Sequence, residues 1–249
     1  NTVISAEEFE YLKKKNILIA KNNVKIDDPK ENVVISTQEI TYDQNTEIIF
    51  TKGFTEARIQ NKYTFYSNDV FYNKQKVELS STKKTQVLDD NFNLYELDEF
   101  NYSKKNFLLK GINVKIKTNF NSNNNSDEYF FNNGFFDLNK RDFNAGNTKI
   151  NMQKGIFGNT ENDPRLLGAT SFKKDETTQI NKGIFTSCKK REGCPPWSIQ
   201  AQKIIHDKNK KQLIYDNALL KIYNFPVIYF PKFFHPDPTV KRQSGLLKP

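Results

Sequence analysis

The chain has 249 residues, of which 38 are Lys or Arg and 29 are Asp or Glu, so its formal net charge is +9. Only 36% of the residues are hydrophobic, but 21 Phe and 11 Tyr argue against long-range disorder. No stretch approaches the roughly 20 consecutive apolar residues of a transmembrane helix. This composition favours strands with one buried face over a helical bundle.

Short strand-like segments that carry a tyrosine recur along the first half of the chain. Tyr11, Tyr42, Tyr72 and Tyr102 follow one another at intervals of 31, 30 and 30 residues. Each copy is followed by a polar turn and then by a second run in which apolar and polar residues alternate. Strand, turn and strand make a hairpin whose single apolar face needs neighbours to bury it. The repeat therefore predicts an all-β stack, either a β-solenoid or an open jellyroll of two sheets.

Alternation at a period of two assigns the apolar residues of these runs to one face, which we expect to point inward. Lys25, Lys115 and Lys221 occupy the opposite face. The predicted inward-facing set consists of Val24, Ile26, Ile40, Tyr42, Val70, Tyr72, Phe100, Tyr102, Ile112, Val114, Ile116, Ala218, Leu220 and Ile222.

Two regions interrupt the repeat. Residues 119–133 are rich in Asn and Ser and are predicted to form a solvated loop or insertion. Residues 155–196 are less regular, and we expect a loop and one or two strands there. They run into a segment over 183–200 that holds both cysteines and two prolines. Since neither region has the composition of a linker, one β domain over residues 1–234 is predicted.

The two cysteines, Cys188 and Cys194, have five residues between them in a segment rich in Gly and Pro. A local disulfide formed in an oxidising compartment is the expected reason for such a pair. Zinc would need two further ligands, and His206 and His235 fit no compact zinc pattern. We therefore predict no metal site and no cofactor.

The sequence has no motif that indicates catalysis. It lacks a nucleophile elbow, a dinucleotide-binding glycine motif and a Walker loop. His206 takes an inward position of the repeat and His235 lies in a proline-rich turn, so a structural role is expected for both. Adjacent acids such as Asp89 and Asp90 flank predicted strands, where they are expected to be solvated. We predict that the chain is not an enzyme.

The positive charge leaves two interpretations open. It suits an anionic partner, such as a phosphorylated glycolipid or an anionic membrane surface. It also fits the Lys-, Asn- and Ile-rich composition that an AT-rich genome produces. The lysines are spread along the chain and form no basic tract, so nucleic-acid binding is not expected.

The most specific signal lies between Gly183 and Pro249. In order, the segment contains Gly-Ile-Phe-Thr-Ser-Cys, Cys-Pro-Pro-Trp-Ser-Ile-Gln-Ala, Phe-Pro-Val-Ile-Tyr-Phe-Pro and His-Pro-Asp-Pro-Thr-Val-Lys-Arg-Gln-Ser-Gly-Leu-Leu-Lys-Pro. These blocks closely resemble the junction between the periplasmic domain and the barrel in the LptD family of lipopolysaccharide-assembly proteins. The earlier repeats resemble the OstA-type β-jellyroll of periplasmic lipopolysaccharide-bridge proteins.

The resemblance implies an OstA-like β-jellyroll whose two facing sheets form a V with open ends. Residues 235–249 would then be the junction and the start of an outer-membrane β-barrel that this sequence does not include. In such a protein, at the periplasmic face of the Gram-negative outer membrane, the inward-facing set would shield the acyl chains of lipopolysaccharide. The implied partners are a periplasmic bridge protein, paired with the N-terminal edge strand, the barrel itself and its plug lipoprotein. Cys188 and Cys194 match the family's cysteine neighbourhood and would pair locally or with barrel cysteines.

Two other functions stay open. A stand-alone periplasmic adaptor of the bridge type would share the repeats but has no need of the C-terminal Lys-Arg-Gln-Ser-Gly-Leu-Leu block. A carbohydrate-active β-helix protein would need acidic residues clustered along one exposed groove. The inward-facing set is also what a closed, dry β core requires, so its chemistry alone does not separate a groove from a core.

Overall fold

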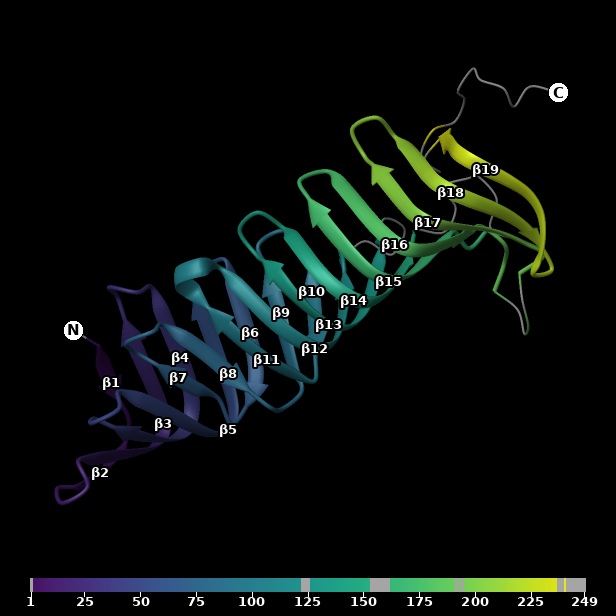
Figure 1. Cartoon of the computed structure of the whole chain (residues 1–249). Coiled ribbons are helices and arrows are strands. Elements are labelled where there is room, and N and C mark those ends of the chain that lie inside the picture. Colours follow the sequence, from purple (N-terminus) through teal and green to yellow (C-terminus); the bar gives the residue numbers. More distant parts are fainter. Residues whose placement is uncertain are drawn as a thin grey trace. The chain divides into compact units, whose positions relative to one another are not determined.

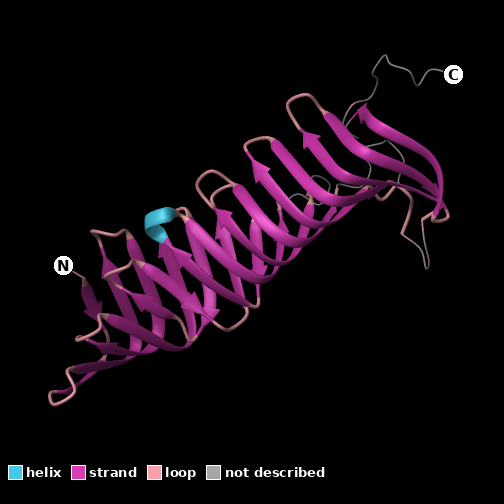
Figure 2. Ribbon diagram, in the orientation of Figure 1, coloured by secondary structure: helices cyan, strands magenta, loops and turns pink. Residues whose placement is uncertain are grey.

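The computed structural model describes residues 2–121, 126–152, 162–190, 193, 195–236 and 240. Strands make up almost all of its regular structure, and the one helix described is a single 3-10 turn, η1 (Lys104–Asn106; Figure 2). None of the described residues lies in a helix long and apolar enough to cross a membrane. The chain forms two compact units, residues 1–121 with 137–139 and residues 122–136 with 140–249.

The first unit contains twelve strands, all paired antiparallel (Figure 1). The strands are β1 (Val3–Ser5), β2 (Glu8–Leu12), β3 (Ile17–Asp28), β4 (Val33–Asp43), β5 (Ile48–Ile59), β6 (Tyr63–Asn68), β7 (Phe71–Asn73), β8 (Glu78–Ser81), β9 (Thr85–Asp89), β10 (Leu94–Leu97), β11 (Glu99–Ser103) and β12 (Leu108–Lys117).

These strands build two sheets that share their longest members. The sheet here called sheet I contains β2, β7, β8 and β11 with one half each of β3, β4, β5 and β12. Sheet II contains β1, β6, β9 and β10 with the other halves of the same four strands. The shared strands therefore join the sheets along one edge. The all-β jellyroll of two facing sheets is confirmed.

The tyrosine repeat becomes one continuous row across sheet I. A step of about 30 residues carries the chain through both sheets and back to sheet I two strands further on. The row consists of Tyr11, Leu18, Tyr42, Ile49, Tyr72, Leu79, Tyr102 and Leu109. A second row crosses sheet II and consists of Ile4, Ile26, Ile35, Ala57, Phe65, Val87, Tyr95 and Ile116.

Residues in the left-handed region of φ mark the points where long strands pass from one sheet to the other. Examples are Asn23 in β3 (φ 52°), Gly53 in β5 (φ 81°) and Asn113 in β12 (φ 50°). Gly and Asn adopt this conformation at the least steric cost. In β3 and β5 the buried positions keep their alternation across the bend, from Ala20 to Val24 and from Thr51 to Thr55. In β12 the bend adds one residue to the alternation, as a β-bulge does, and moves the inward positions by one.

This shift explains why one predicted inward residue lies outside. In β12 the inward side chain before the bend is Leu109, and after it Val114 and Ile116. A constant period of two assigns Ile112 to the same face as Val114 and Ile116. Because Ile112 precedes the bend at Asn113, it lies instead on the outer face and is 45% exposed. The prediction for Ile112 is therefore wrong.

The second unit repeats the arrangement with longer strands. Left-handed Asn147, Lys182 and Asn217 interrupt the ladders in the middle of their strands. Pro231 lies opposite the gap at Asn217, where no ladder hydrogen bond is lost through its missing N–H. The strands are β13 (Glu128–Asp137), β14 (Asp142–Asn151), β15 (Arg165–Lys174), β16 (Thr177–Thr186), β17 (Trp197–Asp207), β18 (Gln212–Ile222) and β19 (Phe225–Pro236).

The predicted polar loop over 119–133 extends too far. Because β13 begins at Glu128, residues 128–133 are strand, and their aromatic residues include the buried Phe131. Residues 122–125 lie outside the described part of the chain. One or two strands are expected between residues 155 and 196, and two are present, β15 and β16.

The bend in β12 gives a test of the left-handed conformation. Asn113→Val forces a β-branched residue to adopt φ near 50° and should lower the free energy of unfolding by about 1–2 kcal/mol. Asn113→Gly also removes the asparagine side chain, but glycine adopts a positive φ without steric cost. The free energy of unfolding should therefore fall clearly less in Asn113→Gly than in Asn113→Val. Urea unfolding of both variants measures the difference. Equal losses would mean that the hydrogen bond from Asn113 to Asp98, and not the backbone, accounts for the effect.

Candidate functional site: the interior between the sheets

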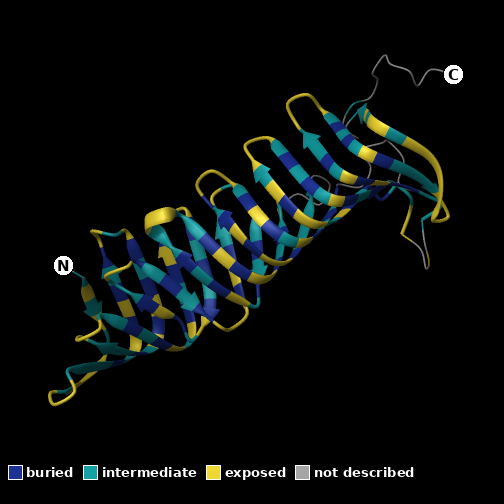
Figure 3. Cartoon of the chain, in the orientation of Figure 1, coloured by how far each residue is buried: buried dark blue, intermediate teal, exposed yellow. Residues whose placement is uncertain are grey.

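Most of the predicted inward-facing residues do lie inside (Figure 3). Tyr42 and Leu220 are half-buried, and Ile222 is 46% exposed at the end of β18, on the face that it shares with Ala218. The fully buried members are Val24, Ile26, Ile40, Val70, Tyr72, Phe100, Tyr102, Val114, Ile116 and Ala218.

Side chains from the two sheets fill the interior of the first unit. The Phe65 ring of sheet II lies 5.3 Å from the ring of Phe100 and 5.2 Å from that of Tyr102, both in sheet I, measured between centroids. Tyr63 of sheet II contacts the Tyr102 ring at 6.4 Å. The buried members of the set have exposed fractions between 0 and 7%. A guest molecule can reach these side chains only if the sheets move apart.

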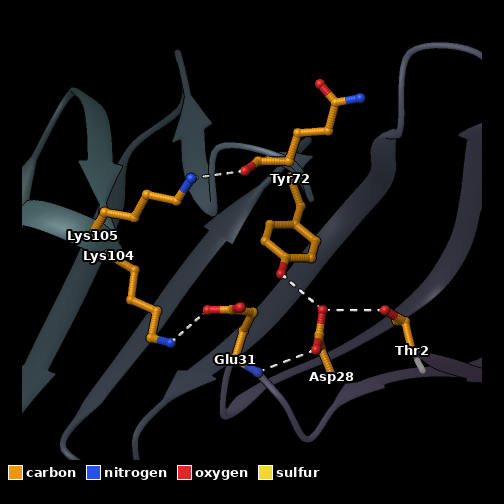
Figure 4. A network of polar contacts seen from close by, with 7 residues as sticks. Thr2, Asp28, Glu31, Tyr72, Lys104 and Lys105 are labelled. Atoms are coloured by element: carbon orange, nitrogen blue, oxygen red, sulfur yellow. Dashed lines mark hydrogen bonds and ion pairs between the residues drawn. The ribbon is translucent and has the colours of Figure 1, made fainter.

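Polar contacts join the sheets at the edge opposite the bends. On the side of sheet II, this edge is formed by the turn after β3. On the side of sheet I, it is formed by Tyr72 and by Lys104 of η1, which contact that turn (Figure 4). Lys104 Nζ lies 2.9 Å from Glu31 Oε2, and the two side chains are 13% and 26% exposed. The Tyr72 hydroxyl donates to Asp28 Oδ2 at 3.4 Å. We call Asp28, Glu31, Tyr72 and Lys104 the lip bridge.

Local contacts hold the lip bridge in place on each side. Asp28 Oδ2 also accepts a hydrogen bond from the Thr2 hydroxyl at 3.1 Å, and Asp28 Oδ1 accepts one from the backbone N–H of Glu31 at 3.2 Å. Burial, followed by the charge of Asp28, raises the pKa of Tyr72, so that its hydroxyl keeps the proton that it donates. Lys105 bonds the carbonyl oxygen of Gln75 at 3.0 Å and does not span the sheets (Figure 4).

A further contact closes the same edge beside Lys104. The Tyr63 hydroxyl of sheet II donates to the carbonyl oxygen of Leu138 at 3.0 Å. The N–H of Leu138 in turn donates to the carbonyl oxygen of Phe107, directly after η1, at 2.9 Å. Several hydrogen bonds, and not a single ion pair, therefore close this edge.

The second unit exposes apolar surface at its last strands. Trp197, Leu220, Phe230 and Phe233 are only partly buried against the core that contains Phe185 and Tyr215. On β19, Phe225 is 76% exposed and Ile228 45%. These residues offer an apolar ligand a surface that needs no separation of sheets.

Sequence reasoning missed these β17 and β19 residues. The signal that could have found them is the apolar run from Phe225 to Phe234, but its two prolines, Pro226 and Pro231, are unfavourable in a central strand. Both prolines are tolerated because β19 is the last strand of the unit (Figure 1).

The histidines lie in structural surroundings. His235 Nδ1 lies 2.7 Å from the carbonyl oxygen of Pro236, which can only accept, so this nitrogen carries the proton. In the neutral ring, Nε2 then accepts from the Tyr215 hydroxyl at 2.7 Å. His206 is half-buried in β17, opposite Leu213.

The structure does not test the predicted pairing of the two cysteines. Cys188 forms no disulfide with another described residue, and its Sγ lies 3.8 Å from the carbonyl oxygen of Trp197. Cys194 lies outside the described residues. The disulfide therefore stays a prediction.

Fold and site together define a β-jellyroll with an apolar interior and a polar closing edge. Part of the chain is similar to LPS-assembly proteins LptD, which confirms the resemblance predicted from the sequence. The match to the Alcanivorax borkumensis protein is 33% identical over 78 residues, or 31% of this chain and 10% of that protein. The match to the Xanthomonas oryzae pv. oryzae protein is 37% identical over 71 residues, or 28% and 8%.

The matched segment spans about a tenth or less of the length of these relatives. No family model matches the chain. Among solved structures, the chain is similar to LptH, the LptA-homologous periplasmic component of the lipopolysaccharide transport device of Pseudomonas aeruginosa. That match has 13% identity and a TM-score of 0.26, and covers 59% of this chain and 82% of LptH.

Two buried tyrosines of the row across sheet I should respond oppositely to loss of the hydroxyl. The Tyr102 hydroxyl is buried without a hydrogen-bond partner among the described residues, so Tyr102→Phe should leave stability unchanged or raise it by about 1 kcal/mol. Tyr72→Phe removes the donor to Asp28 and should lower stability by about 1 kcal/mol. Urea unfolding measures both, and a larger loss for Tyr102→Phe would contradict this assignment.

Proposed function

We propose that the chain acts in lipopolysaccharide transport, as the β-jellyroll of an LptD-like assembly protein that holds lipid acyl chains between its sheets. The observation that carries this proposal is the pair of apolar rows that run unbroken across sheets I and II. The similarity to LPS-assembly proteins LptD supports it.

Free-energy magnitudes favour a guest in this interior. Each buried methylene contributes about 0.8 kcal/mol, so five or six of them contribute about 4–5 kcal/mol. The lip bridge, with one partly exposed ion pair and one long hydrogen bond, and the Tyr63–Leu138 hydrogen bond together contribute about 2–4 kcal/mol. Contacts with acyl chains would also replace those lost between the sheets. One acyl chain therefore suffices to offset the opening of the lip.

The two ends of the chain suit different partners. At the N-terminal end, β1 and β2 both pair with β3, and Val3, Phe9 and Tyr11 are at least 50% exposed. A strand of a periplasmic bridge protein would extend these sheets by β-augmentation. At the other end, the exposed apolar surface of β19 would face the protein's own barrel and plug lipoprotein, at the periplasmic face of the outer membrane.

A crosslink across the lip tests the proposal. In a Cys188→Ser, Cys194→Ser background, Glu31→Cys and Lys104→Cys are joined by a short bis-maleimide, which suits side chains that meet only at their tips. A photo-crosslinker at Val114 then reports lipopolysaccharide in the interior. We expect the crosslink to reduce the lipid adduct about tenfold, equivalent to about 1.4 kcal/mol.

The matched control joins two residues on the same side of the lip. Gln75→Cys and Lys105→Cys, crosslinked by the same reagent, should leave the lipid adduct unchanged because their contact does not span the sheets. Equal adduct yields with the two crosslinks, or no adduct at Val114 before crosslinking, would contradict the proposal.

A further inference from the structure

A hollow of about 440 Å³ lies on the outer surface of the first unit, where β6, β9, β10 and β12 run side by side next to the bends. Its polar residues come from neighbouring strands. Tyr66, Gln86, Glu96 and Lys115 follow one another across sheet II on the face opposite the apolar row. The volume lies within the range of about 300–1,000 Å³ found for small-molecule sites.

Two aromatic rings form one wall of the hollow. The rings of Phe54 and Tyr66 are nearly parallel, at 17°, with centroids 6.3 Å apart, and Phe54 is 59% exposed. They present an apolar surface to solvent within a polar surround. Such a surface suits the C–H-rich face of a sugar ring, because the π-face of an aromatic ring carries partial negative charge.

The facing side chains are planar polar groups already held in place. Asn113 Nδ2 donates to Asp98 at 2.8 Å, and Glu96 lies 3.2 Å from Lys115 Nζ and 3.5 Å from Gln86 Nε2. The amide oxygens of Asn113 and Gln86 and the outer carboxylate lone pairs stay available. Amide and carboxylate groups on neighbouring strands offer hydrogen-bond donors and acceptors to the adjacent hydroxyl groups of a sugar.

The charge and polarity of the hollow narrow the class of ligand. Lys84 and Lys115 balance Glu96 and Asp98, so the site has no net charge, and stacking and hydrogen bonds rather than overall charge would recognise the ligand. Its polar lining does not suit a wholly apolar ligand. Lys84 makes no hydrogen bond or ion pair that involves another described residue, which leaves its ammonium for an acidic group on a sugar.

We infer that this hollow is a saccharide-binding site, with one sugar ring stacked on Phe54 and Tyr66 and its hydroxyls bound by Gln86, Glu96 and Asn113. The site lies outside the interior, so it is independent of the acyl-chain function proposed above. It would bring glycan to the outer face of sheet II while the interior stays closed.

The test is titration of the purified protein with three probes, followed by NMR or calorimetry. The probes are a neutral chito-oligosaccharide, an acidic oligouronate and the phosphorylated oligosaccharide of deacylated lipopolysaccharide. We expect at least one to bind, and the acidic probes to lose affinity in Lys84→Ala. Failure of all three to bind would overturn the inference.

Variants of the aromatic wall locate the binding. Phe54→Ala should weaken binding about tenfold or more, equivalent to about 1.4 kcal/mol, whereas Phe54→Tyr keeps the ring and should retain binding. Phe172→Ala removes a phenylalanine of similar exposure, 47%, from the second unit and should have no effect. Thermal unfolding confirms that each variant is folded. Binding that persists in Phe54→Ala would overturn the site, and the crosslink across the lip should leave binding intact.

Discussion

The burial of two apolar faces against each other is the constraint on which the rest of this structure depends. In the part of the chain that the structure describes, no helix covers either sheet of the first unit, so the two inner rows shield each other from water. The long strands make this possible because they bend at left-handed residues and contribute to both sheets. The same packing that stabilises the fold therefore creates the surface that an acyl chain would use.

This arrangement would concentrate at one edge the opening that the proposed binding of lipid requires. The bends join the sheets covalently along one side, while the other side is held by hydrogen bonds and the Lys104–Glu31 pair. The covalent backbone at the bends cannot break, whereas the polar contacts at the opposite edge, which contribute a few kcal/mol, can. A lipid that enters between the sheets would thus exchange one set of apolar contacts for another and break only the polar closure.

The sequence predicts the repeat well because each tyrosine interval corresponds to one passage through both sheets. The prediction for Ile112 fails because a single left-handed residue, Asn113, shifts the alternation. An asparagine within a strand pattern does not by itself indicate a left-handed conformation. It also misses Trp197, Phe230 and Phe233, whose partial burial depends on their place in the last strands. The lip bridge was not predictable from local pattern, since Glu31 and Lys104 are 73 residues apart.

The central claim is that the sheets of the first unit part at the lip to admit lipid. Spin labels at Lys30, in the turn after β3, and at Lys76, in the turn after β7, would lie on opposite sides of it; both positions are exposed. Electron–electron double resonance, with Cys188 and Cys194 replaced by Ser, gives the distance between the labels with and without lipopolysaccharide. The account predicts a longer distance when lipid is bound. An unchanged distance in a sample shown to contain bound lipid would contradict it.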